Sequence, residues 1–130
     1  MPLLDDHARE LFAGPNIAHV ATLLPDGAPH SVPVMIDVEG DHLAFFTSPE
    51  SRKGRNLRAD DRIAISVTDR ENLVRSALVR GRVVGRVGGD AGWAIIDRIF
   101  ASYTGGPYPR HEPREVFLVA PDRVIVPSFG

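Results

Sequence analysis

Short runs of β-branched residues, separated at regular intervals by turn-forming residues, constrain the fold of this chain more than any other feature. Four such runs cover residues 17–24, 31–38, 42–47 and 62–68. Turn-forming residues such as Pro25-Asp26-Gly27 separate them, and such residues end strands because they favour reversals of the backbone. The pattern predicts a meander of antiparallel strands.

The second half of the chain continues the strand pattern and adds helices. Residues 73–87 alternate in character, and Gly81 and Gly85 are expected where this strand bends tightly at a barrel corner. Apolar residues at three- and four-residue steps predict helices over residues 5–13 and 90–103. A Pro- and Gly-rich loop over 105–114 precedes two last strands, 115–119 and 123–128, on either side of a Pro121-Asp122 turn. Six or seven antiparallel strands with a few short helices predict a mainly β fold, a small barrel rather than a parallel α/β sheet.

A short basic segment carries the first functional signal. Lys53 is the only lysine, in a chain that otherwise uses arginine, and it lies in the run Ser51-Arg52-Lys53-Gly54-Arg55-Asn56. Upstream, Ser48 is expected to cap a helix that starts at Pro49, which would place free backbone N–H groups beside the basic side chains. This combination predicts a phosphate site. The alternative is a solvated basic helix face paired with Asp60 and Asp61.

Composition limits the remaining possibilities. The 130 residues, 43% of them hydrophobic, predict one domain over 1–130. A net charge of −2 and a pI near 6.2 argue against a partner that is a nucleic acid or a membrane surface. There is no cysteine, no secretory signal pattern and no apolar run near the ~20 residues of a membrane span, so we expect a cytoplasmic protein without disulfides.

Several motifs in a fixed order resemble the pyridoxamine 5'-phosphate oxidase-like split β-barrel superfamily. Within it, the chain is most similar to the flavin/deazaflavin oxidoreductases, in the branch that uses coenzyme F420, a deazaflavin, instead of FMN. The motifs that carry the resemblance are Val20-Ala21-Thr22-Leu23, Asp26-Gly27-x-Pro29-His30-x-x-Pro33-Val34, Phe46-Thr47, Ser51-x-Lys53-x-Arg55-Asn56-Leu57 and Val79-Arg80-Gly81-Arg82-Val83.

The resemblance implies a split β-barrel and a homodimer whose cofactor sites lie between the protomers. It also implies roles for particular residues. Those that would hold the cofactor's phosphate and ribityl-like chain are Thr47, Ser48, Lys53, Arg55 and Asn56, and those that would lie along its tricyclic ring are Ser31, Val32, Pro33 and Val34. The acidic tail of F420 would extend towards further basic groups, for which the candidates are Arg52, Arg55 and Arg58.

The function implied is that of an F420-dependent reductase, an oxidoreductase that transfers a hydride to an unsaturated small molecule. One rival is an FMN-binding oxidoreductase of the same family, and another is a non-enzymatic split barrel that binds flavin or haem. Oxidation of a vitamin B6 phosphate is not expected, because the additional C-terminal stretch of the true oxidases has no equivalent here. Where the family often has Asn-Pro-Tyr-Arg, this chain has Asn72-Leu73-Val74-Arg75.

Other conspicuous residues leave alternatives open. His30 would face the cofactor cleft or cap a barrel end, and Trp93 is more typical of a helix core than of a ring-stacking group. Arg80, Arg82 and Arg86 share one strand face, which is either ordinary surface or a contact for an acidic ligand. The other histidines, which lack the spacing of a metal site and are expected in surface or core roles, are His7, His19, His42 and His111.

Overall fold

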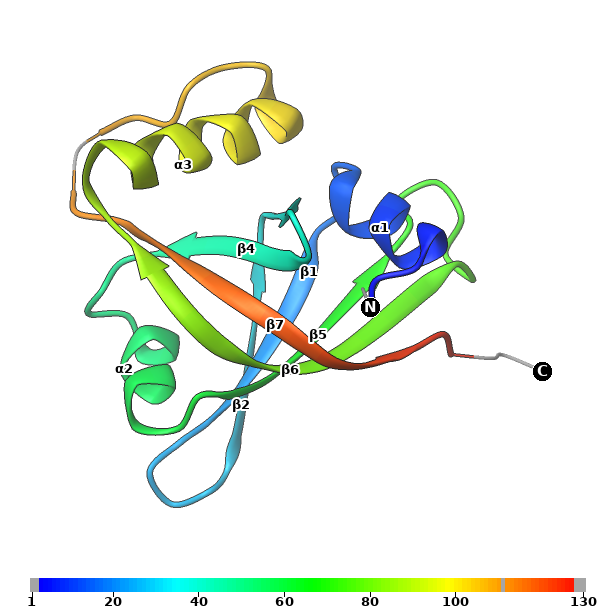
Figure 1. The fold of residues 1–130 in the computed structure, drawn as a ribbon, viewed down its shortest axis with the longest axis horizontal. Coiled ribbons are helices and arrows are strands. Elements are labelled where there is room, and N and C mark those ends of the chain that lie inside the picture. Colours follow the sequence, from blue (N-terminus) through cyan, green and yellow to red (C-terminus); the bar gives the residue numbers. More distant parts are fainter. Residues whose placement is uncertain (1–2, 111, 128–130) are drawn as a thin grey trace.

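The structure, a computed structural model, describes residues 3–110 and 112–127. These residues form three helices and seven strands, which are joined by loops and turns (Figure 1). In chain order they are α1 (Asp6–Ala13), β1 (Ala18–Leu23), β2 (Pro29–Val34), β3 (Ile36–Glu39), β4 (His42–Thr47), α2 (Arg52–Ala59), β5 (Arg62–Thr68), β6 (Ser76–Val87), α3 (Gly89–Thr104) and β7 (Glu115–Ile125).

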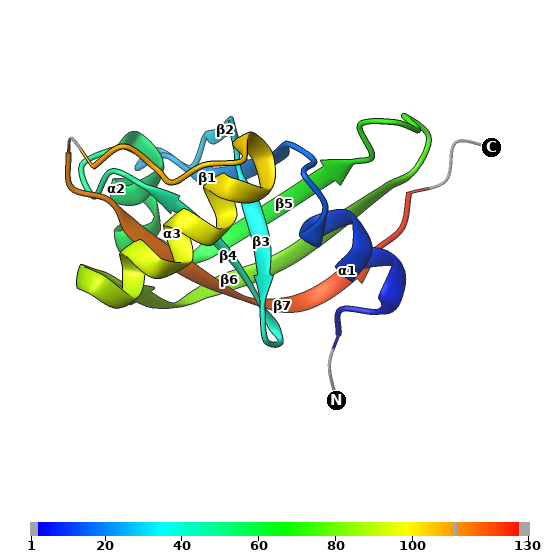
Figure 2. The same cartoon turned by 90° about the horizontal axis from the view of Figure 1, so that it is seen from above.

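All seven strands form one antiparallel sheet in the order β2-β1-β5-β6-β7-β4-β3. The two end strands of this order, β2 and β3, follow one another in the chain with only Met35 between them. The sheet therefore curls until its ends meet at that junction, as Figures 1 and 2 show, and the result is the mainly β split barrel that the sequence predicts.

Two hydrophobic clusters explain why β4 and β7 are apolar on both faces. Inside the barrel, Phe45 and Phe117 stack with ring centroids 5.5 Å apart, and Phe12 of α1 is fully buried in the same cluster. On the outside, Ile96 and Ile99 of α3 join a second cluster that covers β4 and β7. Helix α3 thus lies against the outer face of one half of the sheet (Figure 2).

The glycines of β6 lie where the strand pairing is irregular. The register with β7 shifts between Arg80 and Gly81 and again between Val83 and Gly85. A Cβ atom on Gly81 would lie 2.3 Å from the carbonyl oxygen of Ala120, so no larger residue fits without a backbone shift. The irregular pairing at Gly81 and Gly85 confirms the expected bend of β6 at its glycines.

Three predicted strand limits were wrong. The run 31–38 is two strands, because the chain crosses from one end of the sheet to the other at Met35. The run 115–128 is one strand to Ile125 rather than two, since β6 is long enough to pair on both sides of Pro121-Asp122. Strand β6 starts at Ser76, not at 73, because Asp69 and Asn72 hold a turn there. Ser128 and His111, on which two expectations fall, lie outside the described residues.

Candidate cofactor site

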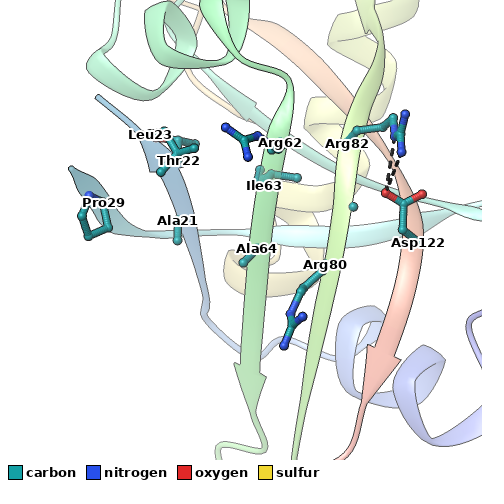
Figure 3. A pocket seen from close by; sticks show the side chains of 11 residues that line it. Ala21, Thr22, Leu23, Pro29, Arg62, Ile63, Ala64, Arg80, Arg82 and Asp122 are labelled. Carbon is teal, nitrogen blue, oxygen red and sulfur yellow. Dashed lines mark hydrogen bonds and ion pairs between the residues drawn. The ribbon is translucent and has the colours of Figure 1, made fainter. Parts of the chain in front are cut away.

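The outer face of β1, β5 and β6 bears a cavity of about 400 Å³ (Figure 3). Its floor consists of small side chains, because Ala21 of β1 and Ala64 of β5 are paired neighbours. Arg80, the neighbour of Ala64 on β6, is exposed at its side. A cavity with an apolar floor and a few charged groups at its border is the general form of a small-molecule site.

A second cavity, of about 460 Å³, adjoins the first because Leu23 and Arg62 line both. It lies between α2 and the turn that connects β1 to β2. Arg52, Arg55 and Asn56 line it on the helix side, so three of the predicted site residues do share one face. Arg55 is exposed there, and its side chain has no hydrogen-bond or ion-pair partner among the described residues, whereas its backbone N–H donates to the Ser51 carbonyl.

Helix α2 begins three residues later than predicted. Its N-cap is Ser51, whose Oγ accepts from the Gly54 backbone N–H at 3.1 Å, whereas Ser48 and Pro49 lie in the preceding turn. Thr47 determines this start, since its hydroxyl donates to Ser51 Oγ at 3.0 Å and holds the capping side chain in place. Thr47 is 7% exposed, so its hydroxyl is part of the helix cap.

Asn56 connects α2 to the barrel interior. Its side chain is 1% exposed, and its Nδ2 donates to Oγ1 of Thr22 on β1 at 3.0 Å. Its Oδ1 accepts from Nε of Arg52, also at 3.0 Å. Both polar atoms of Asn56 therefore have protein partners, and its predicted contact with a cofactor would have to be made beside these bonds.

Lys53 lies on the opposite side of α2 from Arg55, because two helical positions differ by about 200°. The charged residue that influences its pKa is Arg114, in the segment that leads into β7. Burial, and then the positive charge of Arg114, lower the pKa of Lys53 from its ordinary value of 10.5. The basic segment thus has two cationic faces instead of the single cluster that the sequence indicated.

The strand Ser31–Val34 is divided by the alternation of β2. Val32 and Val34 point into the barrel and pack in its core, while Ser31 and Pro33 are exposed on the outer face. Ser31 pairs with Ala21, so it lies beside the floor of the first cavity. Only these two outer residues can offer side chains to a ring on that face, whereas β2, with β1 as its one partner strand, presents backbone groups at its free edge.

Arg58, expected near an acidic cofactor tail, is engaged elsewhere. It donates to the Pro49 carbonyl at 2.9 Å and forms an ion pair with Glu115 at 3.4 Å. The functional candidates that sequence reasoning missed are Arg114 and Tyr108, which lie in the expected loop 105–114. Their only signal was an Arg and a Tyr in a loop rich in proline, which is too common to single out.

The other conspicuous residues divide between surface and core. Arg80, Arg82 and Arg86 are exposed, and Arg82 pairs with Asp122 at 3.3 Å (Figure 3). Trp93 packs in the cluster beneath α3. His30 occupies the same side of β2 as Val32 and Val34, which face the barrel interior. Its Nδ1 is buried and has no hydrogen-bond partner among the described residues.

Two general features are absent from the part of the chain that the structure describes. Residues 3–110 and 112–127 contain no group of three acidic, histidine or cysteine side chains that would hold a metal ion. No helix within these residues has the length and apolar character needed to cross a membrane.

Comparison with known proteins places this geometry in a family. Residues 4–126 match the sequence profile of the family described as pyridoxamine 5'-phosphate oxidase. The chain belongs to this family. A search of curated proteins finds no match.

Several solved structures are similar to the structure of this chain. One is an F420 reductase, 30% identical, with a TM-score of 0.78 over 90% of this chain and 94% of the other. A protein of unknown function from Agrobacterium tumefaciens is 22% identical, with a TM-score of 0.77 over 93% of this chain and 54% of the other. HupZ of group A Streptococcus is 18% identical, with a TM-score of 0.71 over 94% and 92%. The last two support the fold alone.

Proposed function

We propose that this protein is an F420-dependent reductase that transfers a hydride to an unsaturated small molecule. The observation that carries the proposal is the 30% identity to an F420 reductase over nearly the full length of both chains. The two adjoining cavities support it, because the first has an apolar floor and the second is lined by the basic residues Arg52 and Arg55 of α2. This is the order of chemical groups along a flavin-type cofactor, from aromatic ring to anionic tail.

The residues present fit such a cofactor. Ala21 and Ala64 leave room for a planar ring beside Ser31, and Arg52 and Arg55 would meet anionic groups beyond it. When bound, a deazaflavin supplies two-electron hydride chemistry, and the protein's part is to bind it, orient it and keep water away. No proton-transferring side chain is needed for these duties, so we assign no acid or base.

The distinguishing experiment is a titration of the purified protein with F420 and with FMN, followed through the fluorescence of Trp93, the only tryptophan. F420 carries acidic groups beyond its phosphate, so we expect it to bind more tightly than FMN at low salt. The difference should narrow as salt rises, because exposed ion pairs contribute only about 0–1 kcal/mol and are screened. If FMN bound more tightly at every ionic strength, the cofactor would be assigned as FMN rather than F420. The assignment of the fold would not be affected.

Two arginines of α2 provide a matched pair of variants for this titration. Arg55→Gln removes an exposed charge from the second cavity and should weaken F420 binding more than FMN binding. Arg58→Gln removes the same charge from the same helix, but from a side chain already held by Pro49 and Glu115. It should leave the ratio of the two affinities unchanged. Equal effects of the two variants would mean that only the net charge of the helix matters.

We also propose that two copies of the chain form a two-fold dimer with the cofactor sites between them. The first cavity lies on a face of β1 and β5 that the described helices leave open, and a second copy would cover such a face. Light scattering at micromolar concentration should give about twice the chain mass of 14.2 kDa. A monomer under these conditions would contradict the shared site.

A further inference from the structure

A row of directly opposed residues crosses the outer face of the sheet at the first cavity. Ser31 of β2 pairs with Ala21 of β1, which pairs in turn with Ala64 of β5. Ala64 pairs with Arg80 of β6, and Arg80 pairs with Arg123 of β7. Directly opposed residues of an antiparallel pair point to the same face of the sheet. The row therefore leads from a hydroxyl, over two small apolar side chains, to two arginines.

Arg80 differs from the other arginines that line the first cavity. Its side chain forms no hydrogen bond or ion pair within residues 3–110 and 112–127. The other two arginines of the lining are engaged, since Arg62 pairs with Asp60 at 2.7 Å and Arg82 pairs with Asp122 at 3.3 Å. In Figure 3, Arg82 is directed towards Asp122 on β7, whereas Arg80 extends from β6 on the side of β5. The free cation thus lies on the side of the alanine floor.

Arg123 adds a second positive charge at the same border of the cavity. It is exposed, and its side chain has no hydrogen-bond or ion-pair partner in the part of the chain that the structure describes. The carboxylate next to it in the chain, Asp122, is held by Arg82 and does not compensate this charge. Like charges directly opposite each other on neighbouring strands repel. Repulsion from Arg123 therefore favours the direction of Arg80 away from β7.

This arrangement suits a molecule that has an apolar body and one acidic group. The cavity volume of about 400 Å³ is within the range of small-molecule sites. Ala21 and Ala64 leave space for the apolar body, and Arg80 at the border presents a planar guanidinium. The two oxygens of a carboxylate match the donors of a guanidinium, and its single charge balances that of one arginine. A carboxylate bound here would also relieve the repulsion between Arg80 and Arg123.

We propose that Arg80, with Arg123 as its neighbour, binds the carboxylate of an organic acid whose apolar part lies over Ala21 and Ala64. That this acid is the hydride acceptor rests on the function proposed above, whereas the binding of the acid itself does not. The carboxylate stays intact in that reaction, in which one hydride from the reduced cofactor and one proton from water add to the unsaturated bond. The acidic tail of F420 is another source of carboxylates, but it is expected in the second cavity, which Arg80 does not line.

Cinnamate and cinnamamide test this site, because the second carries a neutral amide in place of the carboxylate of the first. Each is titrated into ¹⁵N-labelled protein without cofactor, and again with saturating F420, and binding is followed through the backbone amides of Ala21 and Ala64. We expect cinnamate to bind about fivefold more tightly than cinnamamide at low salt, the upper range for an exposed charge pair. The difference should narrow as salt rises. Equal affinities at low salt, or no binding of cinnamate, would overturn the proposal.

Variants of the exposed arginines provide the second measurement. Arg80→Gln should abolish the preference for cinnamate, and Arg123→Gln should reduce it by a smaller factor because its charge acts from the neighbouring strand. Arg86→Gln is the matched control, since it makes the same change of charge on the same strand, but Arg86 lines a different cavity, with Leu57 and Val84. It should leave the preference unchanged. An equal loss in Arg80→Gln and Arg86→Gln would mean that only net charge matters, and would refute the site.

The outcomes separate the carboxylate site from the proposed function. If cinnamate binds through Arg80 while F420 does not bind, the site stands and the F420 assignment fails. If F420 binds but cinnamate binds no better than cinnamamide, the site is wrong and the function stands. If Arg80→Gln weakens the binding of F420 more than that of FMN and leaves the preference for cinnamate unchanged, Arg80 serves the cofactor tail and the site is refuted. It is also refuted if Arg80→Gln changes only the association of two copies in light scattering.

Discussion

Replacing Asn56 by alanine tests whether this residue is a structural tie or a ligand of the cofactor. The change removes the 3.0 Å hydrogen bond to Thr22, which is 2% exposed, and the 3.0 Å bond from Arg52. A buried neutral hydrogen bond contributes about 1 kcal/mol, and a buried hydroxyl left without a partner costs about 1–3 kcal/mol. With the small cavity that remains, we expect a loss of about 2–4 kcal/mol in the free energy of unfolding.

Urea unfolding, followed by circular dichroism, measures this loss. For a chain of this size the midpoint should fall by roughly 1–3 M, given slopes of about 1–3 kcal/mol/M. Arg55→Ala, on the exposed side of the same helix, is the control and should stay within about 0.5 kcal/mol. Thr22→Val completes a double-mutant cycle, in which a coupling energy of about 0.5–3 kcal/mol with Asn56→Ala is expected. An unchanged midpoint in Asn56→Ala, together with lost cofactor affinity, would refute the structural reading.

Three further predictions concern the fold around the site. Tyr103→Phe should lower the free energy of unfolding by about 1–3 kcal/mol in the same urea assay, because the buried N–H of Ile36 loses its 3.1 Å acceptor. Gly81→Ala should destabilise more than alanine at the exposed Gly88, since its Cβ would lie 2.3 Å from a carbonyl oxygen of β7. Side-chain hydrogen bonds from Arg62 lower the pKa of Asp60 from 3.8 to about 2. The stability from this pair is therefore complete above pH 3.8 and lost as pH falls towards 2, with an NMR midpoint near 2 for the Asp60 carboxylate.

The barrel was predictable because its signals are local. Strand runs, turn residues and the glycines of β6 each act over a few positions, and the strand alternation states which side chains face the core. The strand ends that were predicted wrongly are those that depend on pairing with segments far away in the sequence. Whether the chain from 31 to 39 forms one strand or two depends on where the sheet closes, and the length of β7 depends on how far β6 continues as its partner.

The sequence predicted which segment forms the candidate site, but not how its side chains are arranged in space. The basic run identified α2, but residues close in sequence point in different directions on a helix, so Lys53 and Arg55 serve different faces. Asn56, chosen for its place in a motif, is largely occupied by Thr22 and Arg52. Arg114 was missed because only the pairing of β4 with β7 brings it to the helix, and no local pattern encodes that pairing.

Helix α2 is fixed by three different strands, and this bears on how it would bind a ligand. Asn56 ties it to β1, the bond from Thr47 to the capping Ser51 ties its first turn to β4, and Arg58 pairs with Glu115 at the start of β7. Its two basic faces therefore keep their orientation relative to the open face of the sheet before any ligand arrives. Binding energy is then not spent on ordering the helix, which is how preorganised sites gain affinity from few contacts. Breaking any one tie should consequently weaken ligand binding even where no ligand-contacting side chain has changed.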